Sequence, residues 1–363
     1  MAAEWLSSIR RDLMQSVCDL LSATNDEDLK DVCNKVSAAI AKPPPLGLGG
    51  DHRFLEREWV MLDDKKPVDG VGGRLFFNGS TGRFLRLPVP LLDEENYILV
   101  GASDGLLILG DPEGLHPARL LNPFTGDLIP FAAPIPQESD VLAAVAGSSS
   151  SPTLLFSFED WHGQAVVYCA DPASPLCKVQ FEGSTEGEFY LRSLLSYAGH
   201  FYLVDNAGRI YKVVGKPPQY RADLIATTFD KNFLHYYLVE SARELLLVTR
   251  RHGWDHTVEV FKVDTGKKLL EPVRNIGSRA LFLDYNKCLS VNADKLPSVD
   301  SNCIYYFHCN TITKYDLSNN KVQRFSCVFD DNEAIRPLSL VHTVLTYCAT
   351  DPDICGQIDR LKD

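Results

Sequence analysis

Histidines, cysteines and clustered carboxylates are the residues of this 363-residue chain whose spacing could support chemistry. His252 and His256 stand four apart in RRHGWDH, a spacing that on a helix could place two imidazoles on one metal ion. A glycine lies between them, so we predict a solvated loop and no metal site. Trp254 in the same loop could anchor a binding partner, and the alternative is a tryptophan packed against its own sheet.

Two further groups of reactive side chains also lack the geometry that chemistry needs. The acidic run FDDNEA at residues 329–334 brings three carboxylates together, but it lacks the glycine and the distal glutamate of a calcium loop. His308 and Cys309 are adjacent, and adjacent residues of a strand point to opposite faces, so they cannot share a proton. No Gly-x-Ser-x-Gly motif occurs. We therefore predict no catalytic residue, no metal and no cofactor.

The charge balance excludes one large class of partners. The chain has 48 acidic and 36 basic side chains, which give a formal net charge of -12. Binding along a nucleic-acid backbone requires clustered lysines and arginines, so we expect no nucleic-acid partner. The apolar fraction of 45% is that of an ordinary globular protein that can bury a core.

Targeting signals and disulfides are also not expected. The N-terminus MAAEWLSSIRRDLM carries Glu4 and Asp12 where a signal peptide would have an apolar run, so we expect a chain of the cytoplasm, the nucleus or both. The uncharged stretch at residues 141–158 is broken by GSSSSP, and we expect no membrane association. Ten cysteines are scattered without a Cys-x-x-Cys pair, so we expect free thiols.

The elements that position these residues change character along the chain. Residues 1–40 carry two apolar stripes with helical spacing, and Thr24 to Glu27 has the pattern of a capping box between them. Residues 41–52 are rich in proline and glycine and form a predicted linker. Residues 53–350 contain short strand-like runs, and residues 351–363 are a predicted tail.

A hairpin pattern recurs after the linker. Apolar runs flank a polar turn with glycine or asparagine, and this pattern is centred on Gly82, Gly126, Gly208, Gly266 and Asn320. The interval between Gly126 and Gly208 is long enough for two repeats, and residues 166–181 supply a sixth hairpin with a longer turn. Repeats of about 40–50 residues built from short strands are typical of propeller blades.

One complete repeat can be followed from His235 to Val273, where HYYLVE, ELLLVTR, TVEVFKV and KLLEPV form a predicted four-stranded meander. A single small sheet cannot bury both of its faces, so the repeats must pack against one another. We predict a mainly β protein, a kelch-like β-propeller of about six blades, with five or seven as alternatives. A small N-terminal α-helical segment precedes it.

Three segments resemble a plant family that joins an N-terminal F-box to a KIB-type β-propeller, a domain of unknown function. These segments are GASDGLLILGDPEG with ARLLNPFTGDLIP, LLSYAGHFYLVDNAGRIYKV, and ALFLDYNKCLSVNADKLPSVDSNCIYYF. Their order and spacing are similar to those of the family. The resemblance implies a protein-binding propeller without catalytic residues.

The first forty residues are similar to an F-box, with two departures. Trp5, Asp12 and Cys33 match its pattern, whereas Arg10 stands at the usual proline and Val36 at the usual second tryptophan. The resemblance implies that this segment docks the Skp adaptor of a cullin complex. The implied contacts are Ile9, Leu13, Met14, Val17, Leu21, Leu29, Val32 and Val36. Helical spacing alone equally allows a cap on the propeller.

Three functions follow for the whole chain. The first is a substrate-recruiting subunit of a Skp–cullin–F-box ubiquitin ligase, whose propeller loops, Trp254 among them, bind an unknown target protein. The second is an interaction scaffold that has no ligase association. The third is an enzyme that uses the propeller's central channel, although a fold alone does not establish an activity. We expect the first, with no enzymatic step on this chain.

Overall fold

A computed structural model covers the whole chain, and the fold is described in parts. The described residues are 59–61, 74–93, 97–103, 105–111, 117–136, 141–148, 151–160, 164–182, 189–228, 233–251, 257–284, 287–296, 299–308, 311–327 and 358–360. All of them lie in the second of two compact units, Met1–Leu55 and Glu56–Asp363. The predicted helical segment 1–40 and the linker 41–52 lie outside them.

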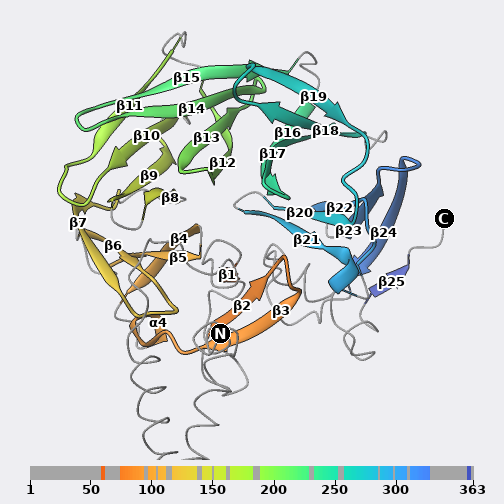
Figure 1. Ribbon diagram of the computed structural model, residues 1–363, viewed down its shortest axis with the longest axis horizontal. Helices are drawn as coiled ribbons and strands as arrows, with labels where there is room; N and C mark the ends of the chain where they lie inside the picture. Colours follow the sequence, from red (N-terminus) through yellow and green to blue (C-terminus); the bar gives the residue numbers. More distant parts are fainter. Residues whose placement is uncertain are drawn as a thin grey trace, which may run out of the picture. The chain divides into compact units, whose positions relative to one another are not determined.

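The described residues are mainly β-strand, and the first two sheets are simple antiparallel meanders (Figure 1). The first contains β1 (Trp59–Met61), β2 (Arg74–Asn78) and β3 (Arg83–Leu87) and is followed by a short helix, α4 (Pro90–Asp93). The second contains β4 (Ile98–Ser103), β5 (Leu106–Gly110), β6 (Pro117–Leu121) and β7 (Leu128–Pro134).

The third sheet has eight strands and consists of two meanders joined edge to edge. The first meander is β8 (Leu142–Ser148), β9 (Ser151–Glu159), β10 (Ala165–Ala170) and β11 (Cys177–Phe181). The second is β12 (Leu191–Tyr197), β13 (His200–Asp205), β14 (Arg209–Lys216) and β15 (Gln219–Thr227). The junction is a parallel pairing of β11 with β15, with Gln180 opposite Arg221.

The fourth and fifth sheets complete the described fold. The fourth is β16 (Phe233–Ser241), β17 (Glu244–Arg251), β18 (Val258–Asp264) and β19 (Leu269–Val273), which confirms the meander predicted from His235 to Val273. The fifth runs in the order β21-β20-β22-β23-β24-β25. Its elements are β20 (Arg279–Leu283), β21 (Cys288–Asn292), the 3-10 helix η3 (Ala293–Lys295), β22 (Cys303–His308), β23 (Thr311–Asp316), β24 (Lys321–Cys327) and β25 (Ile358–Arg360).

The predicted hairpins are confirmed, and local side-chain chemistry explains their turns. Asn78 Oδ1 accepts the Ser80 and Thr81 backbone N–H groups, at 3.1 and 2.9 Å, and Gly82 closes the turn with a φ of 68°. Asn122 Oδ1 accepts the Phe124 N–H in the same way, at 2.9 Å. Such turns need an asparagine side chain and a residue that tolerates positive φ, so the sequence alone reveals them.

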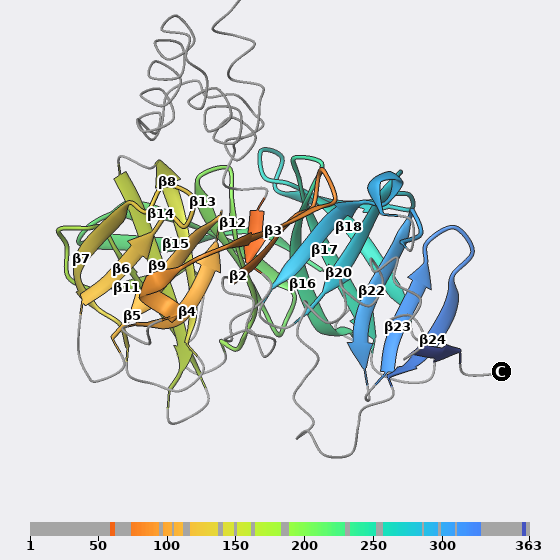
Figure 2. The ribbon, with the colours of Figure 1, turned by 90° about the horizontal axis from the view of Figure 1, so that it is seen from below.

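Apolar side chains fill the spaces between successive sets of strands. Along β17, Leu245 and Leu247 pack in the cluster shared with β13 and β15, whereas Leu246 and Val248 pack in the cluster shared with β20 and β22. Successive strand residues point to opposite faces, so each meander is apolar on both. Three more clusters separate the earlier sets of strands in the same way. Figure 2 shows neighbouring strands of the later sheets side by side.

The first and the last sheets also touch. The backbone N–H of Asn292, at the end of β21, donates to the Gly79 carbonyl in the turn after β2, at 2.9 Å. A Cβ at Gly79 would stand only 2.7 Å from the Ser290 carbonyl oxygen, so this close approach requires glycine. Each sheet therefore contacts the next one along the chain, and the last sheet contacts the first.

The sequence did not predict two features of this fold. Parallel pairings join β11 with β15 and β20 with β22, whereas meanders alone would be antiparallel throughout. Within the predicted tail, β25 pairs with β24. The prediction of free cysteines is confirmed for Cys169, Cys177, Cys288 and Cys303. No described helix is long and apolar enough to cross a membrane.

Candidate functional site

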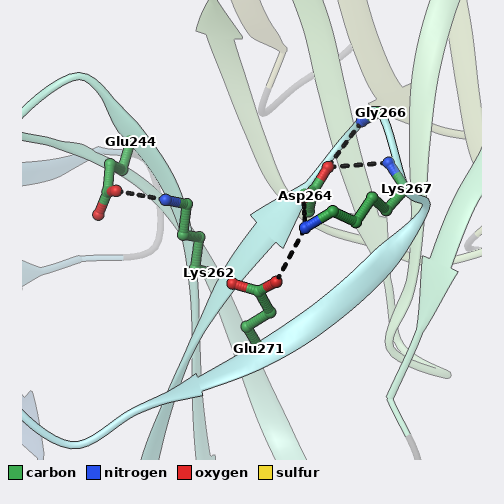
Figure 3. A network of polar contacts seen from close by, with 6 residues as sticks. All are labelled: Glu244, Lys262, Asp264, Gly266, Lys267 and Glu271. Carbon is green, nitrogen blue, oxygen red and sulfur yellow. Dashed lines mark hydrogen bonds and ion pairs between the residues drawn. The ribbon is translucent and has the colours of Figure 1, made fainter.

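The hairpin between β18 and β19 carries a network of charged side chains, which Figure 3 shows. Asp264 Oδ1 accepts the backbone N–H groups of Gly266 and Lys267, at 3.0 and 2.8 Å, which fixes the turn. The hydrogen bonds from Lys267 hold the Asp264 pKa below its usual value. The aspartate is therefore ionised at neutral pH.

Ion pairs extend from this turn across the sheet (Figure 3). Lys267 Nζ lies 3.2 Å from Asp264 Oδ2 and 3.6 Å from Glu271 Oε1. On the neighbouring strands, Lys262 Nζ lies 2.5 Å from Glu244 Oε1. The paired carboxylates raise the pKa of both lysines, so each remains a cation at neutral pH. The surface thus presents alternating fixed charges.

An open hollow of about 550 Å³ lies beside this hairpin, where β11 and β15 meet. Its lining combines both signs of charge with one aromatic side chain, and consists of Gln180, Phe181, Glu182, Arg221, Asp223 and Lys268. Arg221 Nε donates to Asp223 Oδ1 at 2.7 Å, and the arginine side chain is 70% exposed. We use the name charged hollow for this lining together with the charged side chains of the β18–β19 hairpin, Asp264, Lys267 and Glu271.

Two exposed leucines border the charged hollow. Leu224 on β15 is 36% exposed and Leu269 on β19 is 37% exposed, and these two strands contact each other. Lys268 Nζ donates to the Leu224 carbonyl oxygen at 3.5 Å and bridges the two strands. Protein interfaces commonly combine apolar anchors with a polar rim that orients the partner. The charged hollow has this composition.

The chemistry of the charged hollow favours binding. The carboxylate of Asp223 is engaged by Arg221, and the described residues of the lining include no serine, cysteine or histidine that could act as a nucleophile or base. Among the residues that the structure describes, no group of three or more His, Cys, Asp or Glu side chains could hold a metal ion. The arrangement suits recognition of a surface that carries both charges.

The site residues predicted from the sequence lie outside the described parts. These are Ile9, Leu13, Met14, Val17, Leu21, Leu29, Val32 and Val36 of the N-terminal segment and Trp254 of the propeller. The same holds for His252, His256, Cys309 and residues 329–334. The sequence identified the turn at Gly266 but missed the hollow beside it, because the β11–β15 pairing is not encoded in a local pattern.

A family comparison agrees with this architecture. A profile described as KIB1-4 beta-propeller matches residues 76–330. The chain belongs to the KIB1-4 β-propeller family. The match contains three of the five sheets whole and the other two apart from β1, the first two residues of β2, and β25. It also contains the whole charged hollow. The predicted KIB-type propeller is confirmed.

Comparisons with individual proteins add little. No curated protein matches the chain. Among solved structures, a putative 6-phosphogluconolactonase from Bacteroides uniformis is 16% identical, with a TM-score of 0.32, and the match covers 77% of this chain and 80% of that one. The Dos1 propeller is 14% identical, with a TM-score of 0.31, and the match covers 72% of this chain and 66% of that one. Scores this low support no conclusion about function.

Proposed function

We propose that this KIB1-4 β-propeller is a protein-interaction module that holds a target protein against the charged hollow. The observation that carries the proposal is the hollow itself, with paired surface charges and two exposed leucines on the neighbouring strands β15 and β19. The target has a surface with complementary charges of both signs. In this proposal the chain needs no cofactor and catalyses no reaction.

We also propose six blades for the propeller. The five apolar clusters separate six sets of consecutive strands, beginning with β1–β3 and ending with β20–β25. The cluster that contains Leu155, Phe201 and Tyr211 lies between the two halves of the eight-stranded sheet. The halves therefore pack face to face across a core and count as two blades joined at one edge.

The more specific proposal is that the target is ubiquitylated. In this form the first forty residues bind the Skp adaptor of a cullin complex, and the propeller binds the target protein and brings it to that complex. The assembly forms in the cytoplasm or the nucleus. The support is the F-box-like spacing in the sequence, together with the family membership of the propeller. Arg10 and Val36 depart from the F-box pattern and favour the alternative, a scaffold without a ligase.

Reversing two charges in the hollow should release the target. We expect the double substitution Arg221→Glu and Lys268→Glu to weaken target binding at least about tenfold, because the introduced glutamates would repel the target carboxylates that the two cations attract. The measurement is quantitative mass spectrometry of proteins crosslinked to the full chain in cells. The matched control is Lys321→Glu, a charge reversal at an exposed lysine of β24. Equal recovery of every crosslinked protein by wild type and double variant would remove the hollow from the proposal.

A further inference from the structure

A small internal cavity lies where β1, the β4–β5 turn and the start of β21 come together. Its volume is about 30 Å³, and its wall includes Trp59, Met61, Ala102, Ser103, Leu107 and Lys287. A cavity of this size exceeds the ~10–15 Å³ that one water molecule requires. The cavity can therefore accept a group of a few atoms on the amine of Lys287.

Among the described residues of this wall, Lys287 has the only ionisable side chain. It is half-buried, and within the described parts of the chain it forms no ion pair. Burial raises the pKa of the neighbouring Cys288 thiol, whereas the hydrogen bond that its Sγ donates to the Asp284 carbonyl oxygen lowers it. Loss of hydration alone lowers the Lys287 pKa to about 8. None of the described residues that line the cavity is a carboxylate that could reverse this effect.

We propose that Lys287 is an acyl-acceptor site that takes short acyl groups from thioesters. The neutral amine Nζ attacks the thioester carbonyl carbon, the C–N bond forms and the C–S bond breaks. The thiolate leaves and takes up the proton that the nitrogen loses, so the products are an amide and a thiol. This assignment does not depend on the target-binding role of the charged hollow.

Two physical features favour this reaction at Lys287. An amine with a pKa near 8 is about one-tenth neutral at pH 7, whereas one at 10.5 is neutral in roughly one molecule in three thousand. Acylation also replaces a half-buried ammonium by an uncharged amide, which a largely apolar cavity accepts more readily. The small volume restricts the acyl chain to a few atoms.

Lys262 and Lys267 provide matched comparisons within the same chain. Glu244 raises the pKa of Lys262, and Asp264 raises that of Lys267. The Lys262 and Lys267 side chains are 39% and 68% exposed, so a reagent reaches both of them. Faster acylation at Lys287 would therefore reflect its deprotonation and its cavity, and not its accessibility.

The first experiment is trace acetylation of the purified full chain with deuterated acetic anhydride, followed by mass spectrometry of each lysine peptide. We expect Lys287 to react at least about tenfold faster than Lys262 and Lys267 at pH 7, with a rate midpoint near pH 8. Equal rates, or a Lys287 midpoint near that of the two exposed lysines, would overturn the proposal.

The second experiment uses a small thioester, S-acetyl-N-acetylcysteamine, to test the donor class. We expect acetylation centred on Lys287, loss of this modification in Lys287→Arg, and unchanged acetylation elsewhere. Ala102→Leu, which fills part of the cavity, should slow the modification of Lys287 at least about fivefold. Its melting temperature reports whether the variant remains folded. Acetylation by the anhydride without acetylation by the thioester would refute the proposed donor class.

Discussion

Asp205→Ala should lower the free energy of unfolding by about 3–5 kcal/mol, the largest effect that we expect from one substitution. Asp205 lies at the end of β13 and is fully buried. Its Oδ1 accepts the N–H groups of Ala207 and Arg209, at 3.0 and 2.8 Å, and its Oδ2 accepts Arg209 Nε at 2.6 Å. Removing the carboxylate leaves these donors without an acceptor.

The surroundings of Asp205 prevent the turn from adjusting. Gly208 has a φ of 71°, and a Cβ there would stand 2.1 Å from Thr228 Oγ1. The measurement is urea denaturation of wild type and variant, followed by circular dichroism. Asp223→Ala is the control, because it removes the exposed pair with Arg221, which contributes little to stability. An equal, small change in both variants would show that the buried network does not hold the β13–β14 turn.

Lys287→Met should raise the free energy of unfolding by about 1–3 kcal/mol at pH 7, because it removes a poorly hydrated charge from the cavity. The Lys287 pKa falls from 10.5 to about 8 on folding, so the unfolded chain binds more protons between these values. The free energy of unfolding of the wild type therefore increases as the pH rises from about 8 to 10.5, because the penalty for burying the charged Lys287 is lost over this range. Below pH 8 the full destabilisation is present.

The test is to measure the stability difference between Lys287→Met and wild type across this pH range. We expect the advantage of the variant to decrease above pH 8 and to vanish near pH 10.5. Lys262→Met is the control, and its difference should stay constant over this range, because Glu244 raises the Lys262 pKa and the contribution of that lysine is lost only above pH 10.5. A constant advantage of Lys287→Met at every pH would attribute the effect to packing instead of charge.

The predictability of the fold follows the range of the interactions. Each of two hairpin turns is determined by an asparagine and a glycine four residues apart, which are Asn78 with Gly82 and Asn122 with Gly126. Because these interactions are local, the sequence reveals the hairpins. Along the strands, apolar and polar residues alternate or the whole run is apolar. These patterns are also local, so the sequence reveals the strands as well. The coarse architecture, a mainly β propeller, was predictable from these patterns.

The candidate sites depend on contacts between distant segments and were not predictable. The charged hollow requires β11 to pair with β15 in one register, which places Gln180 opposite Arg221. The cavity at Lys287 requires residues near positions 60, 105 and 287 to meet. Neither register nor packing between sheets appears in a local pattern, and in the sequence Lys287 was only one lysine within a strand-like run.

The most direct test of the ligase account is a binding titration of the full chain with purified Skp adaptor. We predict weak but saturable binding, which Leu13→Asp or Val32→Asp abolishes while the propeller keeps its melting temperature. The physical reason is that an unpaired carboxylate in an apolar interface costs several kcal/mol. The contradicting result is no Skp binding by wild type, together with a melting temperature that falls when residues 1–40 are deleted.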